Sequence, residues 1–466
     1  MAGNSIGTSL HESARTEFLK SVWQPYPAAD RTWFDVSEFV ERNQSDFVAG
    51  VVAGRISEID LSARTLNLES DGARVEIKLT EKTDWMRATQ TPFSATLLRT
   101  GDLVAIEVNA AESEAKQPAE ATRLLLLVPT RNGNGYGACG SGTDVKRLNG
   151  SFSPSRSKDW SNFLMSLREF FTSQRFIEVQ TPTLVPSPGT EPFLDPFKTE
   201  WELGSTTRTL YLPTSPEFHL KQMLARGWSR IFEFKTCFRN GEIGEHHQPE
   251  FLMLEWYRAY SNLEAIANDV AGLFKLLATR TGADCQTLER TTIAELFEKH
   301  FDGFELTPKT TRDELATLAR RSNISIQSSD SFDDIFFRLF LDRIESQLGI
   351  EGPLLVSHYP PSQAALSRIG PHGFAERFEV YWNGLELANA FHELNDPFEN
   401  EERFRKDAET KAALGKPAVP RDENLVEALQ NGMPPSGGIA LGVDRLFMAL
   451  YKLKTIDETR AFPLRP

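Results

Sequence analysis

The stretch that decides the fold is FRNGEIGEHHQPEFLMLEWY, residues 238–257. Its second half alternates between a face that carries Phe251, Glu255 and Tyr257 and a face that is purely apolar. This pattern predicts a β-hairpin with Arg239 at the end of its first arm. An arginine beside an aromatic ring suits a nucleotide, and a carboxylate on the same face can hold an amine. Taken alone, the stretch also fits an ordinary buried hairpin with one Arg–Glu ion pair.

The composition predicts a cytoplasmic protein of two or three domains. The chain has 466 residues, of which 40% are hydrophobic, and no apolar run that could span a bilayer. Its N-terminus lacks the basic and apolar regions of a signal peptide. Cys139, Cys237 and Cys285 are scattered without metal spacing, which indicates reduced thiols. The net charge of −14 argues against a protein that binds nucleic acid by bulk electrostatics.

The first 150 residues predict a small β-barrel domain that follows a polar extension. Residues 1–46 form the extension, and residues 47–130 contain about five short strands with an Asp71-Gly72 turn. This pattern favours an oligonucleotide-binding (OB) barrel, with another small barrel or sandwich as the alternative. Residues 1–150 contain 16 Lys and Arg against 20 Asp and Glu, so this part of the chain lacks the net positive charge that is typical of RNA-binding domains. The glycine-rich residues 131–150 predict a linker.

Residues 151–466 predict a second domain of the α+β class. Apolar residues recur at helical spacing from Trp160 to Phe171, and prolines then turn an extended stretch. The remaining expected elements are the hairpin, helices through 263–277 and 332–340, a strand region at 376–396, a polar helical insertion at 399–415 and a glycine-rich C-terminal stretch.

The string TSPEFHLKQML, residues 214–224, predicts the start of a helix that carries a carboxylate. Ser215 is a suitable N-cap, Pro216 suits the first helical position, and Glu217 falls in the first turn. Glu217 either contributes to a binding site or only complements the helix dipole.

Three glutamates recur seven residues apart in ERFEVYWNGLELANAFHELND, residues 376–396. Carboxylates grouped beside a nucleotide suit hard cations such as Mg²⁺, and one left without a metal could instead bind an ammonium group. The alternative is a solvated acidic edge strand.

Strand alternation places Asn389, Phe391 and Glu393 on one face and Glu386 on the other. If Glu386 and Glu393 reach one pocket, the strand must bulge between them. We therefore predict a β-bulge in this strand.

The string GGIALGVDRL, residues 437–446, joins a glycine-rich strand to an apolar helix. The glycines let the backbone approach a ligand closely, and Arg445 at the helix entry could meet a triphosphate. The alternative is a glycine-rich turn in which Arg445 pairs with Asp444 or another acid.

Together these strings resemble motifs 2 and 3 of class II aminoacyl-tRNA synthetases, with Pro182 as the motif 1 proline. The resemblance covers about residues 151–466 and implies an antiparallel sheet flanked by helices. Within the class, MLEWYR, HYPPSQAALSRI and IALGVDR are similar to the lysyl branch, and most similar to its paralogue, the elongation factor P–(R)-β-lysine ligase family. Ala440 favours the ligases, because lysyl-tRNA synthetases usually have glycine there. The Ser-Pro-Glu of TSPEF also favours the ligases, because lysyl-tRNA synthetases usually have alanine before Pro-Glu.

The resemblance implies a role for each motif residue. Arg239 and Arg445 act as catalytic residues on the α- and γ-phosphates, and Glu379 and Glu386 bind Mg²⁺. Residues implied in ATP binding are Arg239, Asn240, Gly241, His247, Gln248, Phe251, Glu386, Leu387, Gly442 and Arg445. Residues implied in the amino-acid pocket are Ser215, Pro216, Glu217, Glu255, Tyr257, Asn389, Phe391, Glu393 and Ala440.

The chain departs from the family pattern at three places. Gly241 stands where the family has glutamate, and the neighbouring Glu242 could supply the missing carboxylate. Gln248 stands where the family has asparagine. In addition, a barrel precedes the catalytic part. The ligases are usually little more than a catalytic domain, whereas a tRNA synthetase would carry such a barrel.

The activity that the resemblance implies is activation of (R)-β-lysine, or lysine, by ATP and its transfer to a lysine side chain of elongation factor P. It also implies a homodimer. One alternative is a lysyl-tRNA synthetase whose barrel reads the anticodon, although Ala440 and the acidic barrel make tRNA an unlikely partner. The other is a catalytically silent, synthetase-like binding or regulatory protein.

Overall fold

The structure is a computed structural model that describes residues 50–70, 73–87, 98, 100–108, 119–128, 154–285 and 287–464. The chain divides into two compact units, Met1–Ser155 and Arg156–Pro466, and each is described by itself. The predicted extension at 1–46, the predicted linker at 131–150 and the Asp71-Gly72 turn lie outside the described residues.

The first unit contains the predicted five-stranded barrel. Its strands are β1 (Gly50–Asp60), β2 (Thr65–Ser70), β3 (Ala73–Arg87), β4 (Leu103–Val108) and β5 (Ala119–Val128). They close in the order β1-β2-β3-β5-β4, with β3 and β5 parallel and the other pairs antiparallel. Alternate residues such as Leu66, Leu68 and Ile77 fill its interior. An OB-like barrel is therefore confirmed as the fold class of this unit.

The second unit is built on an eight-stranded sheet, with the order β11-β12-β13-β14-β15-β10-β9-β6. The strands are β6 (Ile177–Glu178), β9 (Arg230–Phe238), β10 (Glu250–Ala259), β11 (Glu289–Thr292), β12 (Leu354–Tyr359), β13 (Ala375–Trp382), β14 (Leu385–His392) and β15 (Ser436–Gly442). The inner strands are antiparallel as predicted, whereas the short edge strands β6 and β11 pair in parallel, so the sheet is mixed.

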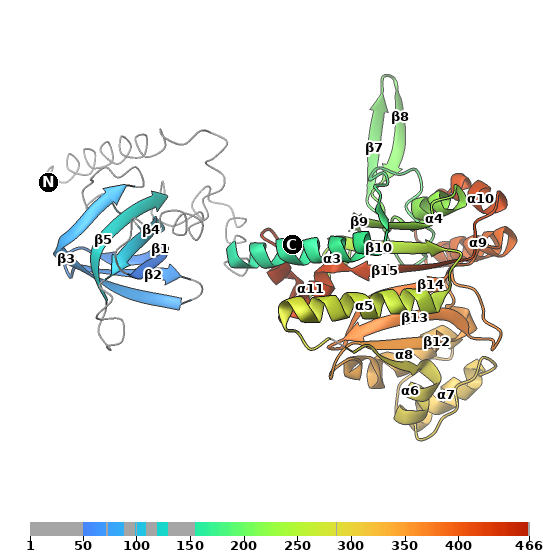
Figure 1. Cartoon of the computed structure of the whole chain (residues 1–466). Helices are drawn as coiled ribbons and strands as arrows, with labels where there is room; N and C mark the ends of the chain where they lie inside the picture. Colours follow the sequence, from blue (N-terminus) through green and yellow to red (C-terminus); the bar gives the residue numbers. More distant parts are fainter. Residues whose placement is uncertain are drawn as a thin grey trace, which may run out of the picture. The chain divides into compact units, whose positions relative to one another are not determined.

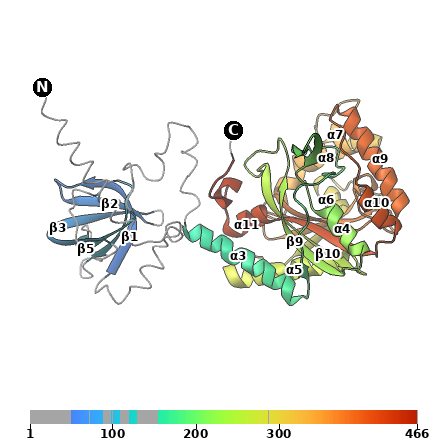
Figure 2. The ribbon, with the colours of Figure 1, turned by 90° about the horizontal axis from the view of Figure 1, so that it is seen from above.

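Helices cover both faces of this sheet (Figures 1 and 2). Their bounds are α3 (Pro154–Ser173), α4 (Glu217–Ala225), α5 (Leu263–Thr281), α6 (Ile293–His300), α7 (Arg312–Arg321), α8 (Phe332–Arg343), α9 (Pro397–Ala413), α10 (Glu423–Gln430) and α11 (Val443–Tyr451). On one face, α3, α5 and α11 pack in a single buried cluster with Leu254 and Trp256 of β10. This contact confirms that the apolar side of the predicted hairpin faces the core.

The opposite face leaves a strip of sheet between two groups of helices. Around Tyr257 of β10, the apolar sides of α4 and α10 pack together with Phe404 of α9. Around Tyr381 of β13, the helices α6, α7 and α8 form a separate buried cluster. The strands β14, β15 and β10 between these two groups present their polar residues on this face, and the candidate site lies there.

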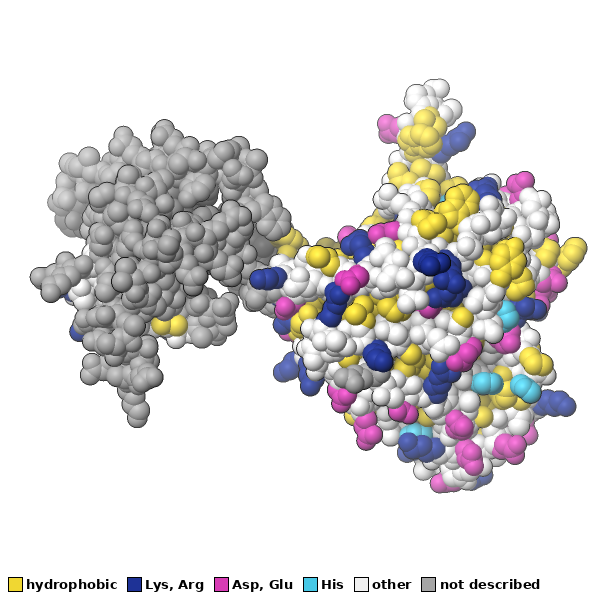
Figure 3. Space-filling model, in the orientation of Figure 1, with side chains coloured by type: hydrophobic (Ala, Val, Ile, Leu, Met, Phe, Trp, Pro, Cys, Tyr) yellow, Lys and Arg dark blue, Asp and Glu magenta, His cyan; other side chains and the backbone are white. Residues whose placement is uncertain are grey.

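A separate two-stranded hairpin, β7 (Lys198–Leu203) and β8 (Thr206–Tyr211), projects from this unit (Figure 1). Trp201 and Leu203 are exposed on it, and hydrophobic side chains can be seen along the hairpin in Figure 3.

Two cysteines fall in the part of the chain that the structure describes. Cys237 and Cys285 are both free and buried, and burial raises the pKa of each thiol. Among the helices in the described ranges, none has the length and apolar character needed to cross a membrane.

Candidate active site

The register of the sheet brings residues from four strands into one row. Glu379 of β13 lies opposite Asn389 of β14, Asn389 opposite Ala440 of β15, and Ala440 opposite Glu255 of β10. Residues directly opposite each other point to the same side of a sheet. Three strings that are distant in the sequence therefore contribute neighbouring side chains to one surface.

The next row shows why glycine is needed in the middle strand. Gly438 lies opposite both Phe391 and Tyr257. A Cβ atom at Gly438 would come within 2.1 Å of Glu393 Oε1 and 2.3 Å of Tyr257 Cε1. Only a glycine lets the carboxylate of Glu393 and the ring of Tyr257 occupy this place.

The predicted β-bulge is present at Leu387. Tyr381 pairs with Glu386, whereas the preceding residue Val380 pairs with Ala388, so Leu387 has no partner in β13. Tyr381 and Glu379 share a face because they are two residues apart on one strand. The bulge therefore returns Glu386 to the face that carries Asn389, and the prediction is confirmed.

The start of α4 connects the second predicted string to this surface. The helix begins at Glu217, one residue later than predicted, because Pro216 precedes it as the cap residue. Ser215 Oγ accepts a hydrogen bond from the Glu217 backbone N–H at 2.9 Å and donates one to Glu255 Oε1 at 2.6 Å. Ser215 thus accepts from the first backbone N–H of the helix and also fixes the carboxylate of the hairpin.

Glu255 is almost completely buried, with 1% of its surface exposed. Tyr257 donates a hydrogen bond to its second oxygen at 2.9 Å. Burial and the nearby Glu217 raise the pKa of Glu255 to about 8, although the hydrogen bonds from Ser215 and Tyr257 act in the opposite direction. Near neutral pH this carboxyl group is therefore mostly protonated. A cationic ligand that binds beside it would favour the ionised form and the release of the proton.

Lys221, which was not predicted as a site residue, lies between two of the predicted carboxylates, Glu217 and Glu393. Its ammonium group is 2.6 Å from Glu217 Oε1 and 2.6 Å from Glu393 Oε2, and both the lysine and Glu393 are buried. Burial favours the neutral amine, but the two carboxylates raise the pKa of Lys221 above its ordinary value. Burial likewise raises the pKa of Glu393 to about 7, although Lys221 opposes this shift. Lys221 thus partly neutralises one side of the pocket.

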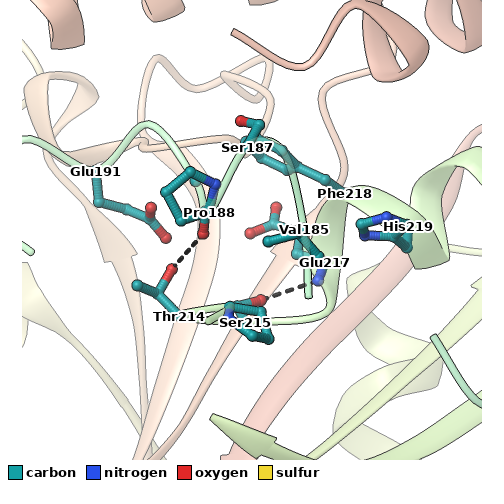
Figure 4. A pocket seen from close by; sticks show the side chains of 11 residues that line it. Val185, Ser187, Pro188, Glu191, Thr214, Ser215, Glu217, Phe218 and His219 are labelled. Carbon is teal, nitrogen blue, oxygen red and sulfur yellow. Dashed lines mark hydrogen bonds between the residues drawn. The ribbon is translucent and has the colours of Figure 1, made fainter. Parts of the chain in front are cut away.

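A cavity opens beside the first turn of α4 (Figure 4). Its lining includes Ser215, Glu217 and a second residue that the sequence analysis missed, Glu191. Burial and the nearby Glu217 raise the pKa of Glu191. The loop that carries Glu191 is held by Thr214, whose Oγ1 donates a hydrogen bond to the Pro188 carbonyl at 2.8 Å. The cavity therefore has a carboxylate from the loop as well as one from the helix.

Arg239 directly follows β9, at the start of the loop that joins β9 to β10. Its guanidinium group stands 5.1 Å from the centre of the Phe251 ring, and its Nη1 is 3.7 Å from Glu242 Oε2. Its buried Nε has no hydrogen-bond partner among the described residues, so this donor can serve a ligand. The following Gly241 has a φ of 82°, a left-handed conformation that disfavours glutamate and explains the glycine at this position.

Arg445 lies between the hairpin loop and the bulged strand. It donates hydrogen bonds to the Glu386 carbonyl at 2.9 Å, to the His246 carbonyl at 3.3 Å and to His247 Nε2 at 2.5 Å. Burial and Arg445 lower the pKa of His247, so its imidazole is neutral and accepts at Nε2. The acid beside Arg445 in the sequence, Asp444, pairs instead with Arg460.

Glu379 and Glu386 form the candidate metal pair. Arg377 and the hydroxyl groups of Tyr359 and Tyr381 already contact Glu379. Burial and the neighbouring Glu379 raise the pKa of Glu386 to about 7. A nearby positive charge would therefore stabilise the ionised form of Glu386. Within the described ranges, no group of three or more acidic, histidine or cysteine side chains could hold a metal by itself. The pair nevertheless fits Mg²⁺ that arrives with nucleotide phosphates, because such an ion needs only one or two protein carboxylates.

The remaining predicted residues lie close to these groups. Asn389 accepts a hydrogen bond from Arg377 at 3.0 Å, and the Asn240 backbone N–H donates to the Asp195 carbonyl at 2.7 Å. Gly442 would place a Cβ atom 3.8 Å from the Leu387 carbonyl, so it packs against the bulge.

The fold and the site together define the catalytic domain of a class II tRNA synthetase. Residues 155–466 match the family model described as tRNA synthetases class II (D, K and N). The chain belongs to this family, in the group of the elongation factor P–(R)-β-lysine ligases.

Two members of that group illustrate the similarity. The elongation factor P–(R)-β-lysine ligase of Edwardsiella ictaluri (strain 93-146) is 39% identical over 307 residues, which are 65% of this chain and 93% of that protein. The ligase of Salmonella schwarzengrund (strain CVM19633) is 39% identical over 305 residues, 64% of this chain and 92% of that protein. The family match begins at residue 155, after the barrel.

Proposed function

We propose that this chain is an ATP-dependent ligase that activates (R)-β-lysine as an adenylate and transfers it to a lysine side chain of elongation factor P. The observation that carries the proposal is a cluster of three carboxylates, the buried Glu255 and Glu393 and the half-buried Glu217, beside a pair of arginines suited to phosphates. An amino acid with two ammonium groups matches such a cluster, because each charge finds a carboxylate. The related ligases carry this activity in their name.

In the first step, the carboxylate of the amino acid attacks the α-phosphorus of ATP, and pyrophosphate leaves. Arg239 binds the α-phosphate with the Nε that has no partner among the described residues, and Arg445 binds the γ-phosphate end. Phe251 supports the adenine, and His247 and the backbone near Leu387 and Gly442 complete the nucleotide site. No side-chain base is needed, because the attacking carboxylate is already ionised.

Glu379 and Glu386 are proposed as the ligands of Mg²⁺. The bound ion would neutralise phosphate charge and supply Lewis-acid polarisation. The repulsion between these carboxylates, which raises the pKa of Glu386, favours a cation at this place.

In the second step, the ε-amine of the acceptor lysine attacks the carbonyl carbon of the adenylate. An amide bond forms, AMP leaves, and the amine loses a proton. The proposal further includes a homodimer in the cytoplasm, with residues 47–130 and 151–466 as separate domains. The dimer and the location rest on the resemblance and the composition.

A second candidate function, charging of a lysine tRNA, is favoured by one observation, the closed five-stranded barrel of the first unit. Barrels of this type commonly bind oligonucleotides. Against it stand the acidic character of that region and Ala440, which lies between Asn389 and Glu255 at a position where the resemblance implies glycine for lysyl-tRNA synthetases.

ATP–pyrophosphate exchange with a panel of amino acids tests the activation step. The proposal predicts the highest kcat/KM with (R)-β-lysine, lower values with (S)-β-lysine and α-lysine, and none with norleucine, which has no side-chain amine. Exchange that is equally fast with norleucine would overturn the proposal. Exchange that is absent with (R)-β-lysine, (S)-β-lysine and α-lysine would also overturn it.

A further inference from the structure

The segment after α11, residues 455–464, is bonded to the loop of the hairpin, residues 242–249. Gln248 of the loop makes the central contact. Its Nε2 donates a hydrogen bond to Asp457 Oδ1 at 2.8 Å, and its Oε1 accepts one from the Leu464 backbone N–H at 3.0 Å. Because a carboxylate oxygen can only accept from an amide N–H₂, these partners fix the orientation of the amide.

Two further contacts surround Gln248. The backbone N–H of Ile456 donates to the Glu245 carbonyl at 2.8 Å. Arg460 of the same segment pairs with Asp444, which precedes the candidate catalytic residue Arg445. The segment is therefore fixed both to the loop and to the first turn of the helix that carries Arg445.

Gln248 itself is not available to contact a nucleotide. Only 2% of its surface is exposed, and both polar ends of its side chain are bonded to the C-terminal segment. His246 and His247, which precede it, are more accessible and contact Arg445. The buried glutamine thus anchors the base of a loop whose exposed part faces the proposed phosphates.

We propose that residues 455–464 are a positioning element of the ATP site, and that Gln248 is the positioning residue through which they hold the loop. This inference rests on the proposed function, because it takes the loop as the part that binds ATP. A loop that is already fixed loses less conformational entropy when ATP binds, so the anchor increases affinity without touching the nucleotide.

An exchange of donor and acceptor tests the contact. Gln248→Glu places a buried carboxylate against the half-buried Asp457, so the hydrogen bond is lost and the two acids repel each other. Asp457→Asn alone keeps an acceptor for Gln248. The double variant restores the bond in reverse, because the new amide at position 457 can donate to the new carboxylate at position 248. The Leu464 backbone N–H still donates to that same carboxylate.

The measurement is the Kd of MgATP by calorimetry on the full chain without amino acid, with the Tm of each variant. We expect Gln248→Glu to weaken ATP binding about tenfold, which is about 1.4 kcal/mol. Asp457→Asn should stay within about threefold of the wild type, and the double variant should recover most of the loss. The Kd of (R)-β-lysine should not change in any of them.

Three results would overturn the inference. They are an unchanged ATP Kd in Gln248→Glu, no recovery in the double variant, or an equal loss of ATP and amino-acid binding. If Gln248→Glu does not fold, Asp457→Ala, which leaves the Leu464 bond intact, must weaken ATP binding several-fold without affecting the amino acid. Failure of the proposed function is distinct, because it would appear as intact ATP binding by the wild type without exchange.

Discussion

Raising the pH from about 6 to about 9 is expected to tighten amino-acid binding, because the pocket must lose protons before it can hold ammonium groups. Burial and Glu217 raise the pKa of Glu255 to about 8, and burial raises that of Glu393 to about 7. A bound ammonium group favours the ionised carboxylate. At a pH below these pKa values the carboxyl group is mostly protonated, so binding must release a proton. Above them no proton needs to leave, and the ammonium keeps its charge up to about pH 10.

The size of the effect follows from the pKa of Glu255. At about pH 7, a group with a pKa of about 8 is ionised in about one molecule in ten, and the binding of a cation then costs about 1.4 kcal/mol more than at pH 9. The KM for (R)-β-lysine in pyrophosphate exchange should therefore fall about tenfold between these pH values. The KM for ATP, measured in the same series, should fall only about twofold, because Glu386, with a pKa of about 7, is already half ionised at about pH 7.

Two variants locate the source of this pH dependence. Glu255→Gln should bind the amino acid weakly and keep only the change of about twofold between about pH 7 and 9 that Glu393, with a pKa of about 7, supplies. Glu202→Gln, an exposed change on β7, should behave like the wild type. A wild-type KM that is constant across the range, or a tenfold change that survives in Glu255→Gln, would show that Glu255 is not the source of the pH dependence.

Three other changes have defined outcomes. Lys221→Met should lower the free energy of unfolding by about 3 kcal/mol in urea titrations, because it leaves two carboxylates without their cation, whereas the exposed Lys275→Met should change it little. A loss below about 1 kcal/mol would contradict the charged contact. Gly438→Ala should raise the KM for the amino acid but not for ATP, since its Cβ would collide with Glu393 and Tyr257. Glu393→Gln should weaken amino-acid binding more than ATP binding in calorimetry, and equal losses would count against its assignment to the pocket.

Local alternation was enough to predict the hairpin and the bulge. The spacing of Phe251, Glu255 and Tyr257 fixes which side of β10 faces the site, because strand side chains alternate. The bulge at Leu387 followed from requiring Glu386 and Glu393 to reach one pocket. The turn between β13 and β14 was not predicted, although Asn383-Gly384 is a strong two-residue hairpin signal.

Contacts between distant segments could not be predicted in this way. Lys221 follows Glu217 by one helical turn and has the pattern of an exposed ion pair, and only the packing of Glu393 against it creates a buried charge. Gln248 resembled a substituted ATP ligand until the fold brought Asp457 to it. The parallel edge strands β6 and β11 have two and four residues, too few for a periodic pattern.

In the proposed reaction, the acceptor of the activated amino acid is a protein lysine and not tRNA. The direct measurement is a transfer assay with purified chain, ATP and labelled (R)-β-lysine, offered elongation factor P and lysine tRNA together. We expect label on the protein, with a mass increase of one β-lysyl group on a single lysine, and an unlabelled tRNA. Label on the tRNA with unmodified elongation factor P would contradict it.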